Sequence, residues 1–205
     1  MTSVLDVTLL GEVFITLFVI MDPPGTIPLF LSLTSGRTPA MRRRAAWQAV
    51  LVAFAVIVLF ALFGRQILSY LQISLPALQA AGGLLLLLVA LELLTGKAEE
   101  PTSAQDVNVA LVPLGTPLLA GPGAIVATMV FVERIDDAAA LTAVVCGVVG
   151  VHVVLWITMR YSVGILRLIR ESGVTLVTRI SGLLLSAIAV QLVADAVRAF
   201  IAGEG

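Results

Sequence analysis

The chain has 205 residues, of which 60% are hydrophobic and 12% are charged, and its mean hydropathy of +1.11 is far above that of a soluble domain. This composition excludes a water-soluble protein, since no soluble core of this size needs so much apolar surface. The formal net charge of -1 gives no basic surface for a nucleic-acid partner.

Several apolar segments have the length of about 20 residues that an α-helix needs to cross roughly 30 Å of hydrocarbon. In chain order the six predicted spans are Leu9–Leu33, Ala45–Gly64, Leu75–Leu94, Val107–Val132, Ala138–Met159 and Ile180–Ile201. The connections between them are short. We therefore expect an all-α, polytopic membrane protein with six transmembrane helices in a single transmembrane domain, residues 1–205.

The first predicted span contains the run Asp22-Pro23-Pro24-Gly25-Thr26. A regular helix does not accommodate it, because proline lacks an amide donor and glycine weakens a helix. Asp22 before Pro23 predicts an N-cap, with proline at the first position of a second half-helix. An acidic side chain near the middle of the membrane also indicates function, and ligand, proton carrier and helix cap stay open as roles for Asp22.

The fourth predicted span contains a second break, with Thr116, Pro117, Gly121, Pro122 and Gly123. Thr116 before Pro117 again predicts an N-cap. Because the first span runs inward and the fourth outward, the two half-helix N-termini should meet at the middle of the membrane. Their free amides attract an anionic group, and unwound carbonyls beside them accept a cation, so a small zwitterion would satisfy both.

The other ionisable residues of the spans have structural and functional interpretations that stay open. Glu92, near the end of the third span, can reach water or pair with Lys97, and Asp195 can pair with Arg198 one turn later. His152 in the fifth span is either a proton relay or a hydrogen-bonded packing residue.

The two halves of the sequence resemble each other. Pro24-Gly25 and Pro122-Gly123 are 98 residues apart (122 − 24), and Gly83 and Gly182 are 99 apart (182 − 83) within similar Gly-Leu-Leu runs. With three spans in each half, the second copy must cross the membrane upside down. We predict two inverted three-helix repeats, residues 1–98 and 99–205, with broken first and fourth helices.

Basic residues are distributed unevenly between alternate connections, and such residues stay on the cytoplasmic side. The opposite connections and the C-terminal end of the sixth span contain only Arg65, Arg134 and Arg198. Nine of the 12 basic residues lie in the first, third and fifth connections: Arg37, Arg42, Arg43, Arg44, Lys97, Arg160, Arg167, Arg170 and Arg179. Both termini should therefore face outward.

The sequence contains no HExxH or GxSxG motif and only one cysteine and one histidine. These residues cannot build a metal site or a nucleophile pair, so we expect no enzyme activity, no cofactor and no bound metal.

At these residues the chain resembles the MarC family, also described as the SnatA-like neutral amino acid transporter family. The matching segments are Asp22–Thr34, Ala81–Leu94, Pro117–Ile125 and Arg179–Leu192, and the first and third are the specific ones. Carried over, the family's broken-helix motifs fall on Asp22, Pro23, Gly25 and Thr26, and on Thr116, Pro117, Gly121, Pro122 and Gly123. Pro24 stands where many relatives have another residue.

The resemblance implies transport of small neutral amino acids such as glycine or alanine. With the residue pattern, it predicts a secondary transporter in the cytoplasmic (inner) membrane that works by alternating access. Its expected partners are the amino acids, the lipid bilayer, a coupling proton or sodium ion, and further copies of the chain in a homo-oligomer. An exporter of drugs or other small amphiphiles and a non-transporting membrane assembly factor are the alternatives.

Overall fold

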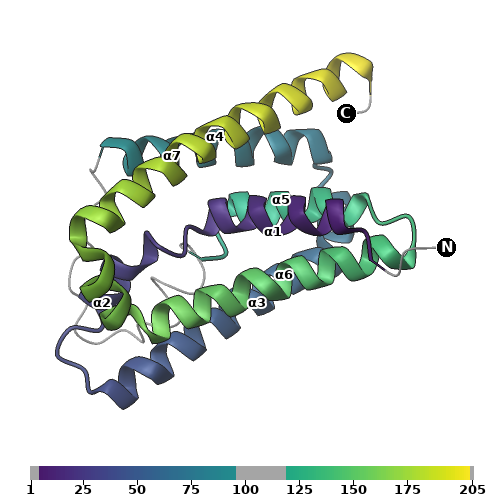
Figure 1. Cartoon of the computed structure of the whole chain (residues 1–205). Coiled ribbons are helices and arrows are strands. Elements are labelled where there is room, and N and C mark those ends of the chain that lie inside the picture. Colours follow the sequence, from purple (N-terminus) through teal and green to yellow (C-terminus); the bar gives the residue numbers. More distant parts are fainter. Residues whose placement is uncertain (1–4, 96–118, 204–205) are drawn as a thin grey trace.

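The structure is a computed structural model that describes residues 5–95 and 119–203. In these ranges the chain is helical, without β-strands (Figure 1). The helices are α1 (Val7–Met21), α2 (Thr26–Leu33), α3 (Pro39–Tyr70), α4 (Leu75–Thr95), α5 (Pro122–Glu133), α6 (Ala138–Arg160) and α7 (Ser162–Ala202). The all-α fold predicted from the sequence is confirmed.

The described helices are long and apolar enough to cross a membrane several times. Four of them qualify alone, namely α3, α4, α6 and residues Ser172–Ala202 of α7, and the pair α1 and α2 adds a fifth span if it is counted as one. The pair is bent by 48° at residues 22–25, which confirms the predicted break in the first span. α5 is a short apolar helix of 12 residues. The preceding part of the predicted fourth span lies outside the described residues, so the count of six spans stays a prediction.

Two helices extend beyond their predicted spans. α3 begins at Pro39 rather than Ala45 and ends at Tyr70 rather than Gly64, because Thr38 caps it and the flanking arginines do not interrupt a helix. The connection predicted between Arg160 and Arg179 is wrong, since α7 already begins at Ser162 and is interrupted only at Arg170 (φ 62°, ψ 166°). Hydropathy locates the hydrocarbon boundary and not the end of a helix, which explains both differences.

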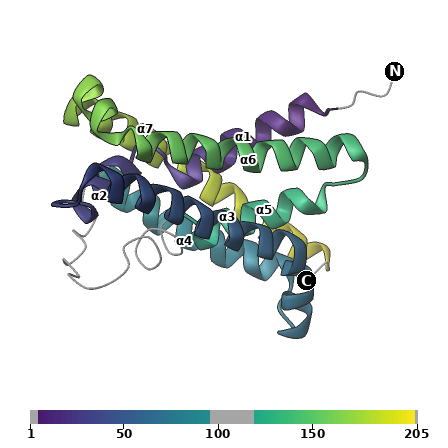
Figure 2. The ribbon, with the colours of Figure 1, turned by 90° about the horizontal axis from the view of Figure 1, so that it is seen from below.

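The bundle has two distinguishable ends (Figures 1 and 2). The start of α3 and the end of α6 lie at one end, together with α2 and the start of α7. The start of α1 and the C-terminal end of α7 lie at the other, together with the turn from α5 to α6. We call these the arginine-rich end and the terminal end.

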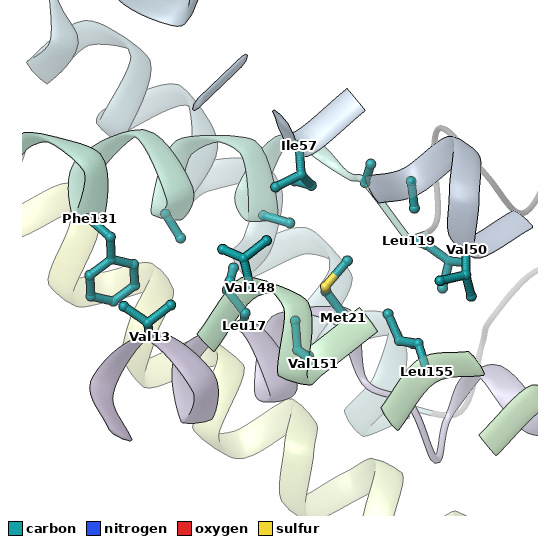
Figure 3. Close-up of a cluster of buried hydrophobic side chains, with 14 of the residues drawn as sticks. Val13, Leu17, Met21, Val50, Ile57, Leu119, Phe131, Val148, Val151 and Leu155 are labelled. Carbon is teal, nitrogen blue, oxygen red and sulfur yellow. The ribbon is translucent and has the colours of Figure 1, made fainter. Parts of the chain in front are cut away.

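The interior consists of two clusters of buried apolar side chains. The larger one joins α1, α3, α5 and α6, and Figure 3 shows Val13, Leu17, Met21, Ile57 and Val148 meeting within it. The smaller one joins α4 and α7 and includes Val19 of α1. Small residues, among them Ala46, Ala49 and Ala53 on α3, allow the helix backbones to approach closely.

α4 and α7 pack on each other through reciprocal contacts. A Cβ atom on Gly83 would lie 2.8 Å from the carbonyl oxygen of Ala189, and one on Gly182 would lie 3.3 Å from the carbonyl oxygen of Ala90. Equivalent residues of the two contacts are 99 positions apart in the sequence, since Gly182 corresponds to Gly83 (182 − 83) and Ala189 to Ala90 (189 − 90). The same contact made twice is what a twofold relation produces. It supports the inverted repeat, which stays a prediction.

Candidate functional site

The first helix break is built by Asp22, Pro23, Pro24 and Gly25. Asp22 ends α1 in the left-handed conformation (φ 39°, ψ 66°), and its amide donates to the Phe18 carbonyl oxygen over 3.0 Å. Gly25 is the N-cap of α2. The prediction that Asp22 caps the second half-helix is therefore wrong. A residue that precedes proline is disfavoured in helical conformation, so the two prolines delay the start of α2 to Thr26.

The carboxylate of Asp22 is the most unusual group in this break. Asp22 is 7% exposed, and neither carboxylate oxygen has a hydrogen-bond partner in the part of the chain that the structure describes. The Gly25 amide and the Ser181 hydroxyl lie near it, without the geometry of a full hydrogen bond. Burial of a charged carboxylate without a partner raises the free energy of the folded protein. A ligand that supplies a cation or a hydrogen-bond donor would lower it again.

Gly25 is needed because the chain approaches itself closely here. A Cβ atom at this position would overlap the Asp22 carboxylate and lie 3.2 Å from the Thr178 hydroxyl oxygen. The first break therefore packs on α7 at Thr178 and Ser181. The motif-based analysis did not include these two hydroxyl residues in the site. The signal for Ser181 was its place in the segment that repeats Gly82-Gly83, which suggested packing alone.

The start of α2 offers few free amides to an anion. The Thr26 amide donates to the Asp22 carbonyl and the Ile27 amide to the Pro24 carbonyl, over 3.0 and 3.2 Å. The prolines 23, 24 and 28 have no amide hydrogen, so Gly25, which lies against the Asp22 carboxylate, has the remaining donor. This helix end is therefore better suited to a cation held by Asp22 than to an anion.

The second break is described from Leu119 onward, so Thr116 and Pro117 lie outside the described residues. Leu119 and Ala120 form a turn, Gly121 is the N-cap in extended conformation (φ -62°, ψ 164°), and Pro122 is the first residue of α5. Because residues 119–121 are not helical, the second half-helix does not run unbroken from Pro117, as predicted, but begins as α5 at Pro122. The described residues of this break, 119–123, contain no acidic side chain. The positive end of the α5 helix dipole is therefore not neutralised by a carboxylate from these residues.

Gly123 has a packing role. A Cβ atom there would overlap the side chain of Leu86 on α4, with Cδ1 at 2.7 Å. Gly82 approaches Val126 in the same way. A larger residue at Gly123 would thus push α5 away from α4, whatever it does to a ligand.

The two breaks border the same part of the interior. Met21, the last residue of α1, and Leu119 belong to the larger core cluster, together with Leu155 (Figure 3). α2 leads from the first break to the arginine-rich end, whereas α5 leads from the second break to the terminal end (Figure 1). Two half-helices therefore begin inside the bundle and run to opposite ends, as the sequence predicted.

His152 lies in the core between α6 and α3. Its Nδ1 is 2.7 Å from the Val148 carbonyl oxygen and therefore carries the hydrogen, which leaves Nε2 as an acceptor with no partner in the described ranges. The ring meets Phe54 edge-on at 5.1 Å, and the two positions are 98 residues apart (152 − 54). The intrahelical bond fits the packing interpretation.

An acidic cavity of about 510 Å³ opens at the terminal end, far from Asp22. Asp6, one of its lining residues, precedes α1 and lies roughly 24 Å along that helix from the first break. Glu12 in its wall pairs with Arg134 over 2.6 Å. The lining residues are Asp6, Thr8, Leu9, Glu12, Glu133, Arg134, Asp136, Asp137 and Ala140. Among the described residues, no three His, Cys, Asp or Glu side chains are grouped to hold a metal ion.

Comparison with known proteins covers almost the whole chain. Residues 7–201 match the model of the MarC family integral membrane proteins. The UPF0056 membrane protein MJ1677 of Methanocaldococcus jannaschii is 35% identical over 90% of this chain and 94% of its own. YhcE of Escherichia coli is 32% identical (93% and 92% covered), and YvbG of Bacillus subtilis is 30% identical (89% and 90% covered).

No solved structure matches the chain significantly. The family match extends from the start of α1 to within one residue of the end of α7, and the three relatives are 30% to 35% identical over about nine-tenths of the chain, so the similarity is not confined to the broken-helix segments. The chain therefore belongs to the MarC family of integral membrane proteins.

Proposed function

We propose that this protein is a secondary transporter of small neutral amino acids of the glycine and alanine class. The observation that supports this most directly is the buried, unpartnered carboxylate of Asp22 at an interrupted membrane helix. Interrupted helices whose half-helix ends point at a central site are the usual construction of substrate sites in such transporters.

The two breaks differ in charge, and this difference suits a zwitterion. The ammonium group would bind Asp22, with the hydroxyls of Thr178 and Ser181 as further polar contacts. The carboxylate would bind the Gly123 amide at the N-terminus of α5, because Pro122 has no amide hydrogen and the Ala124 and Ile125 amides donate to the Gly121 carbonyl oxygen. Each break thus has one remaining amide, and the second differs in that its described residues, 119–123, contain no acidic side chain to compete. This refines the sequence-based hypothesis, in which both half-helix ends received the carboxylate.

The surroundings of the site favour a small, neutral side chain. Met21, Leu119 and Leu155 are all nearly fully buried apolar residues in the adjoining core. A charged side chain on the substrate would have to be desolvated against them, at a cost of several kcal/mol. An exporter of drugs or other amphiphiles would instead need room for a large apolar group, and the close packing at Gly25 argues against such room.

Alternating access would expose this site in turn to each side of the cytoplasmic membrane, with both termini outside. A proton or a sodium ion at Asp22 would be the coupling ion, because a cation there relieves the same electrostatic cost as the substrate ammonium. The inverted repeat would provide two related arrangements of the bundle around the site.

Uptake of labelled alanine by proteoliposomes tests the proposal. We expect saturable uptake that unlabelled glycine inhibits and that protein-free liposomes lack. A protein that binds no amino acid and moves none under a proton or a sodium gradient would instead be an assembly factor, and inhibition by amphiphilic drugs alone would favour the exporter.

A further inference from the structure

The described arginines differ in pairing between the two ends of the bundle. At the terminal end each one has a carboxylate partner, in the pairs Arg65–Glu133 (2.8 Å), Arg134–Glu12 (2.6 Å) and Arg198–Asp195 (3.3 Å). At the arginine-rich end no arginine forms an ion pair with a side chain that the structure describes. These residues are Arg37, Arg42, Arg43, Arg44, Arg160, Arg167 and Arg170, and Arg179, which follows Thr178 beside the first break, likewise has no ion pair with a described side chain.

Both tryptophans of the chain lie at this end and touch each other. Trp47 of α3 and Trp156 of α6 meet edge to face, with ring centroids 6.5 Å apart and planes at 83°. The guanidinium carbon of Arg160 lies 5.3 Å from the Trp156 ring and 5.7 Å from the Tyr161 ring. Tryptophan and tyrosine are typical of the headgroup level of a bilayer, so these contacts mark the membrane boundary.

Helix geometry places further arginines beside this cluster. α3 begins and α6 ends at the arginine-rich end (Figure 1), so Arg43 and Arg44 lie one turn from Trp47 toward water, as Arg160 lies one turn from Trp156. One turn in the opposite direction, Leu51 and Val153 are 49% and 46% exposed. From water toward the hydrocarbon region, this surface is therefore first cationic, then aromatic and then apolar.

We propose that Arg43, Arg44, Trp47, Trp156 and Arg160 form a binding site for an anionic phospholipid. The phosphate would accept hydrogen bonds from the guanidinium groups. Stacking of Arg160 on Trp156 leaves the edge of its guanidinium available. The Nε of Arg43 donates to the Pro39 carbonyl oxygen over 3.3 Å, so its two terminal nitrogens would face the phosphate. The acyl chains would follow Leu51 and Val153 along α3 and α6. A phospholipid would contact the cationic, aromatic and apolar parts of this surface, whereas a free phosphate would contact only the cationic part.

Tryptophan fluorescence tests the proposal directly, since both tryptophans belong to the site. The full chain is placed in phosphatidylcholine nanodiscs with a small fraction of either brominated phosphatidylglycerol or brominated phosphatidylcholine. We expect clearly stronger quenching by the phosphatidylglycerol, and addition of inorganic phosphate should not reduce it. Each basic residue near an anionic surface contributes about fivefold to lipid enrichment. Equal quenching by the two lipids, or loss of the difference on adding phosphate, would overturn the site.

Variants locate the effect. The combined change Arg43→Gln, Arg44→Gln and Arg160→Gln should abolish the preference, while the same three residues changed to Lys should keep most of it. Arg198→Gln at the terminal end is the matched control and should behave as the wild type. An unchanged preference in the Gln variant, with its helical circular dichroism intact, would refute the assignment. If the Gln variant does not fold, loss of the preference in the Lys variant would also contradict it.

Discussion

Asp22 combines burial, charge and the lack of a hydrogen-bond partner in the described ranges. A charged carboxylate in the hydrocarbon region costs about 3 kcal/mol or more, so the residue is expensive unless something binds it. Its position after α1 and before two prolines also prevents the local helix from satisfying it. These facts make Asp22 the residue on which binding should depend most.

Asp22→Asn should weaken alanine binding and slow transport about ten- to a hundredfold, because a charge-assisted hydrogen bond to the substrate ammonium becomes a neutral one. Asn keeps the size of the side chain, so expression and helix content should not change. Asp195→Asn is the control, since this residue forms an exposed ion pair with Arg198. Initial rates in proteoliposomes give the answer, and wild-type rates for Asp22→Asn would exclude Asp22 as ligand or ion carrier.

Gly25→Ala should also reduce transport strongly, because the new methyl group would displace the Asp22 carboxylate and crowd Thr178. Gly11→Ala on α1 is the matched control, since nothing lies within 4 Å of the added methyl. Uptake assays on the two variants at equal protein density should separate them. Full activity of Gly25→Ala would show that the close approach is not required.

At the scale of helices, the hydropathy pattern predicted α4 and α6 within one residue at each end and located the break after Met21. The capping pattern placed the starts of α2 and α5 too early, because local capping rules do not include the restriction that a proline imposes on the residue before it. Thr178 and Ser181 could not be predicted as site residues, since their contact with the first break depends on how α7 packs. The break at Arg170 has no signal in the sequence that we recognise.

The packing of α4 on α7 predicts unequal effects of two equivalent glycines. Gly83→Ala should destabilise the fold by about 1 to 3 kcal/mol, because its Cβ would press on a backbone carbonyl that cannot rotate away. Gly182→Ala should cost less, since its nearest contacts are 3.1 to 3.3 Å. Thermal melting in detergent measures both against Gly164→Ala, which has open space. A Gly83→Ala protein as stable as the control would contradict the packing.

For the whole molecule, the uneven distribution of arginines between the two ends predicts the orientation in the membrane, with both termini outside. We expect Cys introduced at Ser3 or Gly203, in a Cys146→Ser background, to react with a membrane-impermeant maleimide in intact cells. Cys at Ser35, in the turn between α2 and α3 at the arginine-rich end, should be protected. The reverse pattern of labelling would overturn the orientation.

The membrane class and family were predictable at this scale because they depend on composition and on motifs that are contiguous in sequence. The inverted repeat was suggested by offsets of 98 and 99 residues, and the reciprocal contacts at Gly83 and Gly182 now support it. The part that sequence could not provide is the burial of the Asp22 carboxylate without a hydrogen-bond partner among the described residues, beside Thr178 and Ser181 of α7.

Competition against labelled alanine tests the central claim that a zwitterion binds between a carboxylate and a helix N-terminus. Ethylamine lacks the carboxylate and propionate lacks the ammonium, so each loses one charge-assisted contact. We predict that both compete at least about tenfold more weakly than unlabelled alanine, since such a contact is worth about 1.5 kcal/mol or more. Competition by either compound as effective as that by alanine would contradict the account.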